Sequence, residues 1–540
     1  MKRTSKPLLA ALFSLLCALP LSAQIDPTVE VSREYDVKLQ SIDKPFIGTQ
    51  VPDSLRDFHI NMNYYTVDKP YADLYDFSPH RTFLLADAPK QRAPFIYAKL
   101  FGALPYSAEG GLYLQTPVWK GLSLSAFADH ASYWPKGDTL AYDLRRTGFM
   151  KNSAGLKARY EWSRGVASLD AHYSGDVYRY WDTLFTKSVS DRYGVTLNVH
   201  SNDYASIRPF YDVTASYNYM KGGIDSDSLY TGRFYEHTID VKATGGGVFR
   251  NNRILLEFET HDRISDYNAG FFSITPYYQY LNNLVDIRAG FRIASKTVSQ
   301  TDGRIYSSRV KNFFPMLEFR VNVVPKLLWL NASVDGDNYL NSYAEMRGAF
   351  PWISATPFLN YSYDSYRAKV EMRLSIRNRL AVSAFVGYGA SKNMPFLLPV
   401  DSLHVMDLEY VNATHVTAGA DAAWNSNDVT ATAYYRFNKC TRDDGGVASL
   451  VPANEAGGEV RYNYRQRIFA KASFYYRSPV AFGASVIDSC YDLSLTAGYV
   501  SDRYFTFFLK AGNLLGKKNV YVPWSISQPR NFGLGISFKF

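Results

Sequence analysis

The chain has 540 residues, of which 46% are hydrophobic, 16% aromatic and 20% charged, and its formal net charge is +9. No apolar run near the ~20 residues of a membrane-spanning helix follows the amino terminus, which excludes a helical membrane protein. The basic residues are spread along the chain, so no nucleic-acid partner is predicted, and contact with anionic lipid head groups explains the charge more simply.

The amino terminus has the pattern of a secretory signal peptide. Lys2 and Arg3 precede an apolar stretch at residues 8–21, and Ala23 provides the small residue of a cleavage site. We therefore expect residues 1–23 to be a signal peptide that is removed on export.

Residues 24–92 differ from the rest of the chain. They are rich in proline and charge and hold one clear alternating run, residues 58–65. Such a segment has little core of its own, so we expect an amino-terminal periplasmic or lumenal segment that leans on another structure.

From residue 93 to residue 540, apolar and polar residues alternate with a period of two, which is typical of β-strands with one apolar face. The alternation predicts twenty-two strands and an all-β fold. They cover residues 95–104, 111–119, 122–134, 151–162, 167–181, 192–200, 208–220, 237–249, 253–263, 270–281, 284–295, 312–324, 327–335, 367–376, 380–390, 415–424, 429–438, 457–465, 468–477, 491–500, 504–514 and 532–540.

The connections between these strands alternate in length. Every second one is short and made of turn-forming residues, as at 120–121 and 282–283, whereas those between are mostly longer, as at 336–366 and 391–414. Short periplasmic turns alternating with long extracellular loops are the pattern of outer-membrane barrels. The prediction is a transmembrane antiparallel β-barrel at residues 93–540, in the outer membrane of a Gram-negative cell.

Several strands carry charge on one face only. In residues 367–376, for example, Lys369, Glu371 and Arg373 alternate with apolar residues. A Lys or Arg turned to mid-bilayer lipid costs roughly 2 to 4 kcal/mol, so the charged faces are expected to line the lumen. The candidate lumen-facing residues are Lys157, Arg159, Asp240, Lys242, Asp286, Arg288, Arg292, Glu318, Arg320, Lys369, Glu371, Arg373, Glu459 and Arg461.

Three interpretations of this charged face stay open. The residues pair with one another around a hydrated wall, they form a weakly anion-favouring path or a site for an acidic solute, or they pack against a plug-like segment.

Cys440 and Cys490 are the cysteines that remain after export, and both fall in predicted external loops. In an oxidising compartment they either form a disulfide that ties the two loops together or stay as free thiols.

The closing strand carries a family resemblance. Large apolar residues occupy every second position from Phe532, ending with Phe538 and Phe540. This segment resembles the carboxy-terminal signature by which outer-membrane barrels are recognised, which implies the barrel assembly machinery as a partner. Residues 505–515 resemble the penultimate strand of TonB-dependent receptors, and the segment before the barrel resembles that of related barrel proteins of Bacteroidota.

The resemblance has one departure. Members of that family carry a folded amino-terminal plug, and residues 24–92 are too few to form it. A barrel of this width needs plugging. We therefore expect a barrel without the standard plug, which puts TonB-driven import in doubt.

No zinc-binding or nucleophile motif occurs in the sequence, so we expect no cofactor, no metal and no enzyme activity. The preferred function is transport or binding of a solute across the outer membrane. The alternative is a structural or docking subunit of an outer-membrane assembly, secretion or surface-display complex. Outer-membrane lipid is an expected partner, as are other outer-membrane proteins or surface lipoproteins.

Overall fold

The computed structural model describes residues 95–119, 121–135, 145–180, 187–201, 210–225, 232–265, 267–300, 310–354, 359–376, 379–400, 405–465, 467–483, 485–501, 504–523 and 525–540. The predicted signal peptide and the predicted amino-terminal segment lie outside them. Within the described residues there is no helix with the length and apolar character that crossing a bilayer requires.

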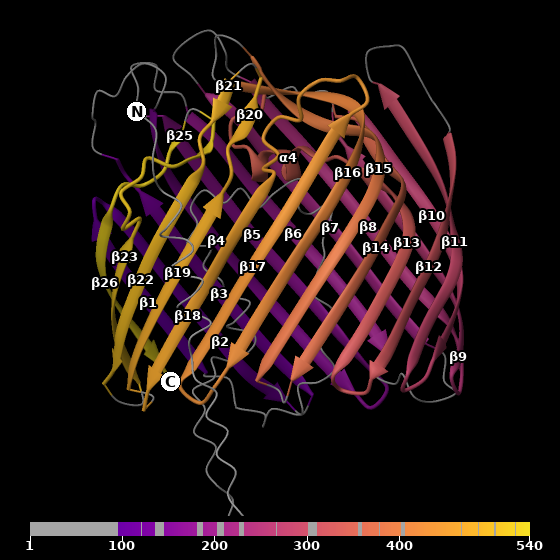
Figure 1. Ribbon diagram of the computed structural model, residues 1–540, viewed down its shortest axis with the longest axis horizontal. Helices are drawn as coiled ribbons and strands as arrows, with labels where there is room; N and C mark the ends of the chain where they lie inside the picture. Colours follow the sequence, from indigo (N-terminus) through magenta and orange to yellow (C-terminus); the bar gives the residue numbers. More distant parts are fainter. Residues whose placement is uncertain are drawn as a thin grey trace, which may run out of the picture. The chain divides into compact units, whose positions relative to one another are not determined.

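Twenty-two antiparallel strands form a closed barrel (Figure 1). Each strand pairs with the next, and the first strand also pairs with the last, with Ala98 opposite both Leu112 and Phe538. The barrel strands are β1 (Ile96–Leu104), β2 (Ser107–Trp119), β3 (Leu122–Tyr133), β4 (Arg145–Trp162), β5 (Gly165–Tyr180), β6 (Lys187–Ser201), β7 (Phe210–Asp225), β8 (Gly232–Phe249), β9 (Asn252–Ile264), β10 (Tyr267–Leu281), β11 (Val285–Gln300), β12 (Val310–Val324), β13 (Leu328–Leu340), β14 (Tyr361–Ile376), β15 (Leu380–Val400), β16 (Val405–Asn425), β17 (Val429–Arg442), β18 (Asn454–Tyr464), β19 (Ile468–Arg477), β22 (Cys490–Val500), β23 (Phe505–Gly512) and β26 (Asn531–Lys539).

All twenty-two predicted strands are present, and their ends at the short turns are close to prediction. Most of the ends at the long loops extend further than expected, although β3, β5 and β23 do not. Residues 391–414, predicted as a loop, instead continue the pairing of β15 with β16 up to Val400 and Val405. The backbone ladder holds these ends together where the apolar alternation has stopped.

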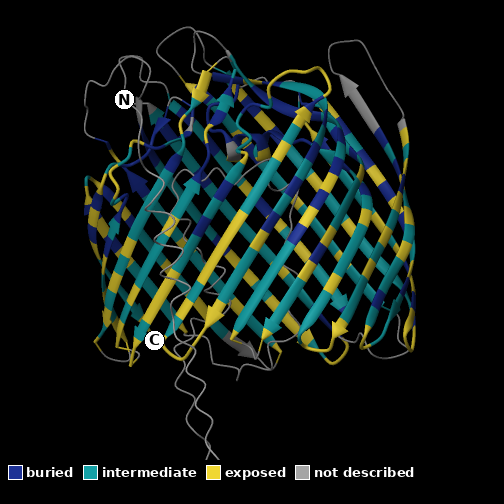
Figure 2. Cartoon of the chain, in the orientation of Figure 1, coloured by how far each residue is buried: buried dark blue, intermediate teal, exposed yellow. Residues whose placement is uncertain are grey.

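The two faces of the wall differ in character along each strand, as the alternating colours of Figure 2 show. Leu100, Leu156 and Ile254 point outward, and each is about two thirds exposed. An apolar outer band with a polar inner face is the arrangement that a lipid bilayer requires of a barrel. Buried residues gather instead near the end of the barrel that carries the long loops (Figure 2).

The long loops carry the remaining elements. These are the helix α4 (Tyr343–Ala349) and the short strands β20 (Val480–Phe482), β21 (Ser485–Ile487), β24 (Val520–Val522) and β25 (Ser525–Ile526). β20 and β21 form a small hairpin, while β25 pairs in parallel with the outer end of β4. The loop before the last strand therefore reaches past the barrel's closing strands to β4.

Candidate functional site

The loop between β13 and β14 folds into the barrel instead of projecting from it. It was expected to be an external loop, and the structure corrects this: α4 lies inside the wall near the loop end of the strands (Figure 1). Ser342 and Glu345 form a capping box that starts the helix at this point. We call the described residues of this connection, 341–354 and 359–360, the inward segment.

Strands β8 and β9 of the wall hold the inward segment at its amino-terminal half. The Glu236 carboxylate on β8 accepts hydrogen bonds from the Tyr343 and Ala344 amides at 2.8 and 3.1 Å. Arg263 on β9 donates to the carbonyl oxygens of Asn341 and, at 3.0 Å, of Leu359. One buried arginine therefore joins both ends of the inward segment to the wall.

Further bonds fix the helix and the residues after it. Arg192 on β6 donates to the Ala344 carbonyl at 2.7 Å, and Arg347 donates to the Ser188 hydroxyl on the same strand. Residues 352–354 form a parallel bridge with the outer end of β16 through Ile353 and Met406. The segment thus contacts strands that precede and strands that follow the β13–β14 hairpin in the barrel order.

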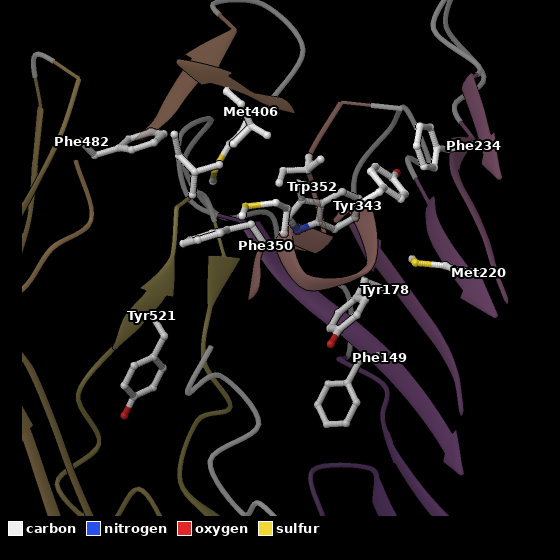
Figure 3. Packing of buried hydrophobic residues seen from close by; sticks show 14 of the residues in the cluster. Phe149, Tyr178, Met220, Phe234, Tyr343, Phe350, Trp352, Met406, Phe482 and Tyr521 are labelled. Carbon is white, nitrogen blue, oxygen red and sulfur yellow. The ribbon is translucent and has the colours of Figure 1, made fainter. Parts of the chain in front are cut away.

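An apolar cluster extends across the loop end of the barrel (Figure 3). Phe350, Trp352 and Ile353 of the inward segment are almost fully buried. The cluster also includes Tyr343, Met346 and Leu359 of the same segment. Its other members come from strands and loops around the barrel: Tyr133, Phe149, Tyr178, Met220, Phe234, Leu397, Met406, Leu408, Phe482, Cys490 and Tyr521. The inward segment is thus packed into a continuous apolar layer near the loop end of the barrel.

A cavity of about 690 Å³ lies between α4 and the wall formed by β4 to β10. Its volume is within the range of small-molecule sites. Most of its lining residues are polar or charged, among them Lys151, Asp176, Arg192, Asp240 and Glu259. No group of His, Cys, Asp and Glu side chains with metal-binding geometry occurs among the residues that the structure describes.

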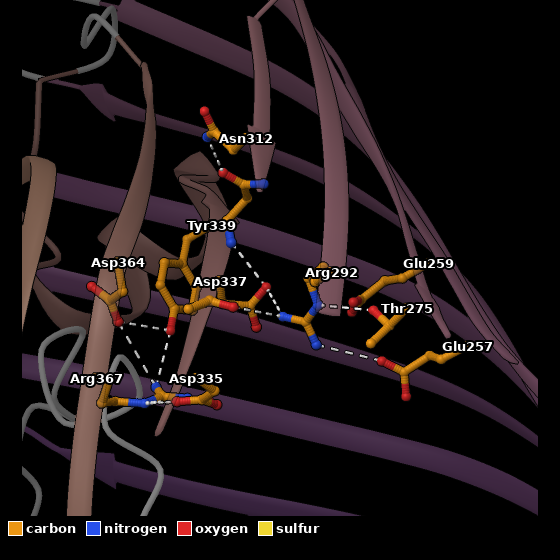
Figure 4. Close-up of polar contacts among 12 residues, drawn as sticks. Glu257, Glu259, Thr275, Arg292, Asn312, Asp335, Asp337, Tyr339, Asp364 and Arg367 are labelled. Carbon is orange, nitrogen blue, oxygen red and sulfur yellow. Dashed lines mark hydrogen bonds and ion pairs between the residues drawn. The ribbon is translucent and has the colours of Figure 1, made fainter. Parts of the chain in front are cut away.

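Most of the predicted charged residues form ion pairs with neighbours, and Figure 4 shows the contacts around Arg292 and Arg367. Arg292 bridges Glu257 on β9, at 3.5 Å, and Asp337 on β13. Arg367 joins Asp335 at 2.9 Å. In both cases one guanidinium connects different strands, which favours the interpretation of a mutually paired wall.

Most of the other predicted residues also form ion pairs. Ion pairs join Asp240 to His261, Lys242 to Glu257, Arg288 to Asp286 and Glu318, Arg320 to Asp286 and Glu318, Lys369 and Arg373 to Glu371, Arg461 and Lys471 to Glu459, and Arg159 to Glu161. Lys157 has no ion pair within the described part of the chain. Glu236 and Arg263, which hold the inward segment, were not predicted from the sequence.

Cys440 and Cys490 lie in strands, not in loops, and both are free thiols. Cys440 is in β17 and Cys490 begins β22, with β18 and β19 between them. Three strand spacings separate the two positions by roughly 14 Å, and a disulfide tolerates at most about 7 Å between Cα atoms. The possible disulfide is therefore excluded in this fold.

We expect the two thiols to stay unlinked after export. A maleimide reagent of large mass should then add to both cysteines of the unfolded protein with no prior reduction, because neither thiol is oxidised. Reduced and non-reduced samples should migrate identically on a gel. A mobility difference that disappears in a Cys490→Ser variant would contradict this.

The closing strand lies at the seam of the barrel. Phe538 packs against Phe505, with ring centroids 5.3 Å apart, and Phe540 is 61% exposed. Phe538 lies on β26, and Phe540 follows the last residue of that strand, Lys539. Their role as an assembly signal stays a prediction.

The structure is similar to those of several outer-membrane transport proteins. The copper transporter OprC matches with a TM-score of 0.65 and 10% identity, over 83% of this chain and 81% of that chain. The FrpB iron transporter of Neisseria meningitidis matches with a TM-score of 0.65 and 8% identity, over 84% and 82%. The siderophore receptor PirA of Acinetobacter baumannii matches with a TM-score of 0.64 and 10% identity, over 83% and 81%.

The sequence itself matches no family model and no curated protein. At these identities the similarity is one of fold. It nevertheless agrees with the closed barrel of twenty-two strands and with the apolar outer band. The chain is therefore a multi-pass β-barrel of the Gram-negative outer membrane, with the fold of TonB-dependent receptors.

Proposed function

We propose that this protein binds and moves a polar solute across the outer membrane, and that the inward segment is its gate. The observation that carries the proposal is the position of this segment: an apolar layer above closes the mouth, and a polar cavity lies between α4 and the wall. A paired and therefore rigid charged wall supports the hydrated lumen that such transport needs. The fold of the similar copper, iron and siderophore proteins supports the same class of function.

The proposed gate would also act as the barrier that seals the barrel. A barrel of this width needs a barrier, and the inward segment supplies one from between β13 and β14. We propose that it takes the part that a standard amino-terminal plug plays in the resembled receptors.

Conductance in planar bilayers tests the gate. A gateless variant replaces residues 343–353 with a short glycine and serine linker, and it is measured with and without residues 25–92 so that the leading segment cannot hide the result. We expect the wild type to be nearly ion-tight and the gateless variant without residues 25–92 to conduct steadily. The reason is that the linker removes Phe350 and Trp352 from the apolar layer.

Two controls accompany this measurement. A milder variant, Trp352→Ala, serves as a second test in case the gateless protein fails to fold. It removes one large side chain from the apolar layer, so we expect intermittent channel openings. Retention of the folded gel mobility shows that each barrel is intact. If a folded gateless barrel remains ion-tight with residues 25–92 deleted, the proposal that the inward segment is a gate is wrong.

A structural or docking subunit is the second candidate, and one observation favours it. The apolar layer joins the inward segment to the ends of β15, β16 and β22 as a continuous core, which suits a permanent closure as well as a gate. Purification from native membranes decides between them. Stoichiometric outer-membrane or lipoprotein partners, together with a mouth that never opens, would support the docking role.

A further inference from the structure

The charges that line the cavity are separated between its two ends. At one end Lys151 on β4, Arg192 on β6 and Arg347 on α4 lie within electrostatic reach of one carboxylate, Asp176 on β5. Lys151 and Asp176 are cross-strand neighbours. Asp176 forms no ion pair or hydrogen bond with another described residue. Asp191 on β6, which does not line the cavity, also lies within reach of Asp176, so three positive groups face two negative ones and this end of the cavity is basic.

The other end has the opposite balance. Asp240 on β8, Glu259 on β9 and Glu345 on α4 line this end of the cavity together with a single imidazole, that of His261. His261 bonds Asp240 at 2.6 Å and Glu259 at 2.8 Å. The pKa of the Glu345 carboxyl is raised, first because the surrounding protein removes water from it and also because Asp240 is close, while hydrogen bonds with Ser342 oppose the shift. This end is acidic.

Neutral polar groups line the cavity between the two ends. Ser190 on β6 is only 9% exposed and has no hydrogen-bond partner among the described residues. Asn218 and Thr238 are cross-strand neighbours on β7 and β8, and their side chains also have no partner within that part of the chain. Buried polar groups are normally hydrogen-bonded, so these groups are available to a ligand.

The separation of charge sets the length of that ligand. Arg192 and Asp240 lie two strands apart, and Asp176 and Glu259 lie four strands apart, which corresponds to roughly 10 to 19 Å. An extended peptide of about three to six residues spans that distance.

We infer that the cavity binds a short zwitterionic peptide, with its carboxylate between Lys151, Arg192 and Arg347 and its ammonium group between Asp240, Glu259 and Glu345. The inference rests on the proposed function, since it names the solute class of the same site. Arg192 bonds the Ala344 carbonyl through one nitrogen, Nη2, which leaves the rest of its guanidinium for the ligand carboxylate. The neutral side chains between the ends bond the peptide backbone, which offers both donors and acceptors.

Calorimetric titration of the full-length protein in detergent tests the inference with tetra-alanine as the probe. We expect tetra-alanine to bind, and its N-acetylated and C-amidated forms to bind at least about tenfold more weakly, because each loses one charge-assisted contact. Arg192→Gln should weaken tetra-alanine about tenfold and leave the C-amidated peptide unchanged. Asp240→Asn should have the corresponding effect on the ammonium end and spare the N-acetylated peptide.

Arg159→Gln is the matched control, because Arg159 lies on the same wall but pairs with Glu161 outside the cavity. Its affinity for tetra-alanine should equal that of the wild type. Two results would overturn the inference of a zwitterionic peptide ligand. One is that a peptide blocked at both ends binds as tightly as tetra-alanine, and the other is that tetra-alanine does not bind at millimolar concentration. Either outcome can occur with the conductance of the gateless variant as expected, so failure of the ligand class is distinguishable from failure of the gate.

Discussion

Replacing Arg263 with alanine is expected to free the inward segment and turn a nearly ion-tight barrel into a leaky one. Arg263 is 1% exposed, and its guanidinium holds the carbonyl oxygens of Asn341 and Leu359. It also lies within electrostatic reach of the buried Glu236 carboxylate. Removing one partner of a buried charged pair costs about 3 to 5 kcal/mol. That is enough to shift the segment from closed to largely open.

Limited proteolysis measures this opening directly. Arg347 lies in the middle of the segment and is 3% exposed, so trypsin should not cleave after it in the wild type. In the Arg263→Ala variant we expect cleavage there, identified by mass spectrometry, and a parallel rise in bilayer conductance.

The matched control is Arg233→Ala, because Arg233 lies on the neighbouring strand β8 and is exposed. In the Arg233→Ala variant, Arg347 should stay protected from trypsin and the barrel should stay ion-tight. A double variant, Glu236→Gln with Arg263→Met, should recover part of the protection, since it leaves no unpaired buried charge. Continued protection of Arg347 in Arg263→Ala would show that the apolar layer alone keeps the gate closed.

The largest loss of stability is expected for Glu109→Ala. Glu109 on β2 is 4% exposed and binds two lysines, Lys99 on β1 at 3.1 Å and Lys510 on β23 at 2.8 Å. These strands lie on both sides of the junction between β1 and β26 that closes the barrel. The variant leaves both ammonium groups without this carboxylate, so we expect a loss of about 3 to 5 kcal/mol.

Unfolding in denaturant, followed by tryptophan fluorescence, measures the loss. Glu161→Ala is the matched control: its partner Arg159 is on the same strand, and both side chains are about half exposed. An exposed pair is worth at most about 1 kcal/mol, so the midpoint should hardly move. Equal midpoints for the two variants would mean that the junction does not depend on the buried carboxylate.

Sequence alone was sufficient for the architecture of this barrel. The strand at residues 468–477 has the bounds that alternation predicts, because lipid on one side and water on the other enforce a period of two. Beyond the lipid that constraint ends. The sequence therefore underestimates β15 and β16, whose outer ends are held by backbone pairing alone.

For the charged residues, the sequence predicts only part of the arrangement. Alternation identifies which face of residues 367–376 carries charge, but it does not say that Lys369 pairs with Glu371 at 2.8 Å or that Arg367 reaches Asp335 on the next strand. The Arg367–Asp335 contact depends on the register between β13 and β14, and the Lys369–Glu371 contact depends on the side-chain conformations within β14.

The amino-acid sequence by itself determined the strand number, the two faces and the alternation of short turns with long loops. Only the tertiary structure decided that the inward segment folds into the barrel. A signal was present, because Phe350, Trp352 and Ile353 are large apolar residues in a loop that would otherwise face water. Their burial depends on Glu236 and Arg263, about a hundred residues earlier in the chain. Local periodicity carries no information about such a partner, because the contact exists only once the barrel has closed.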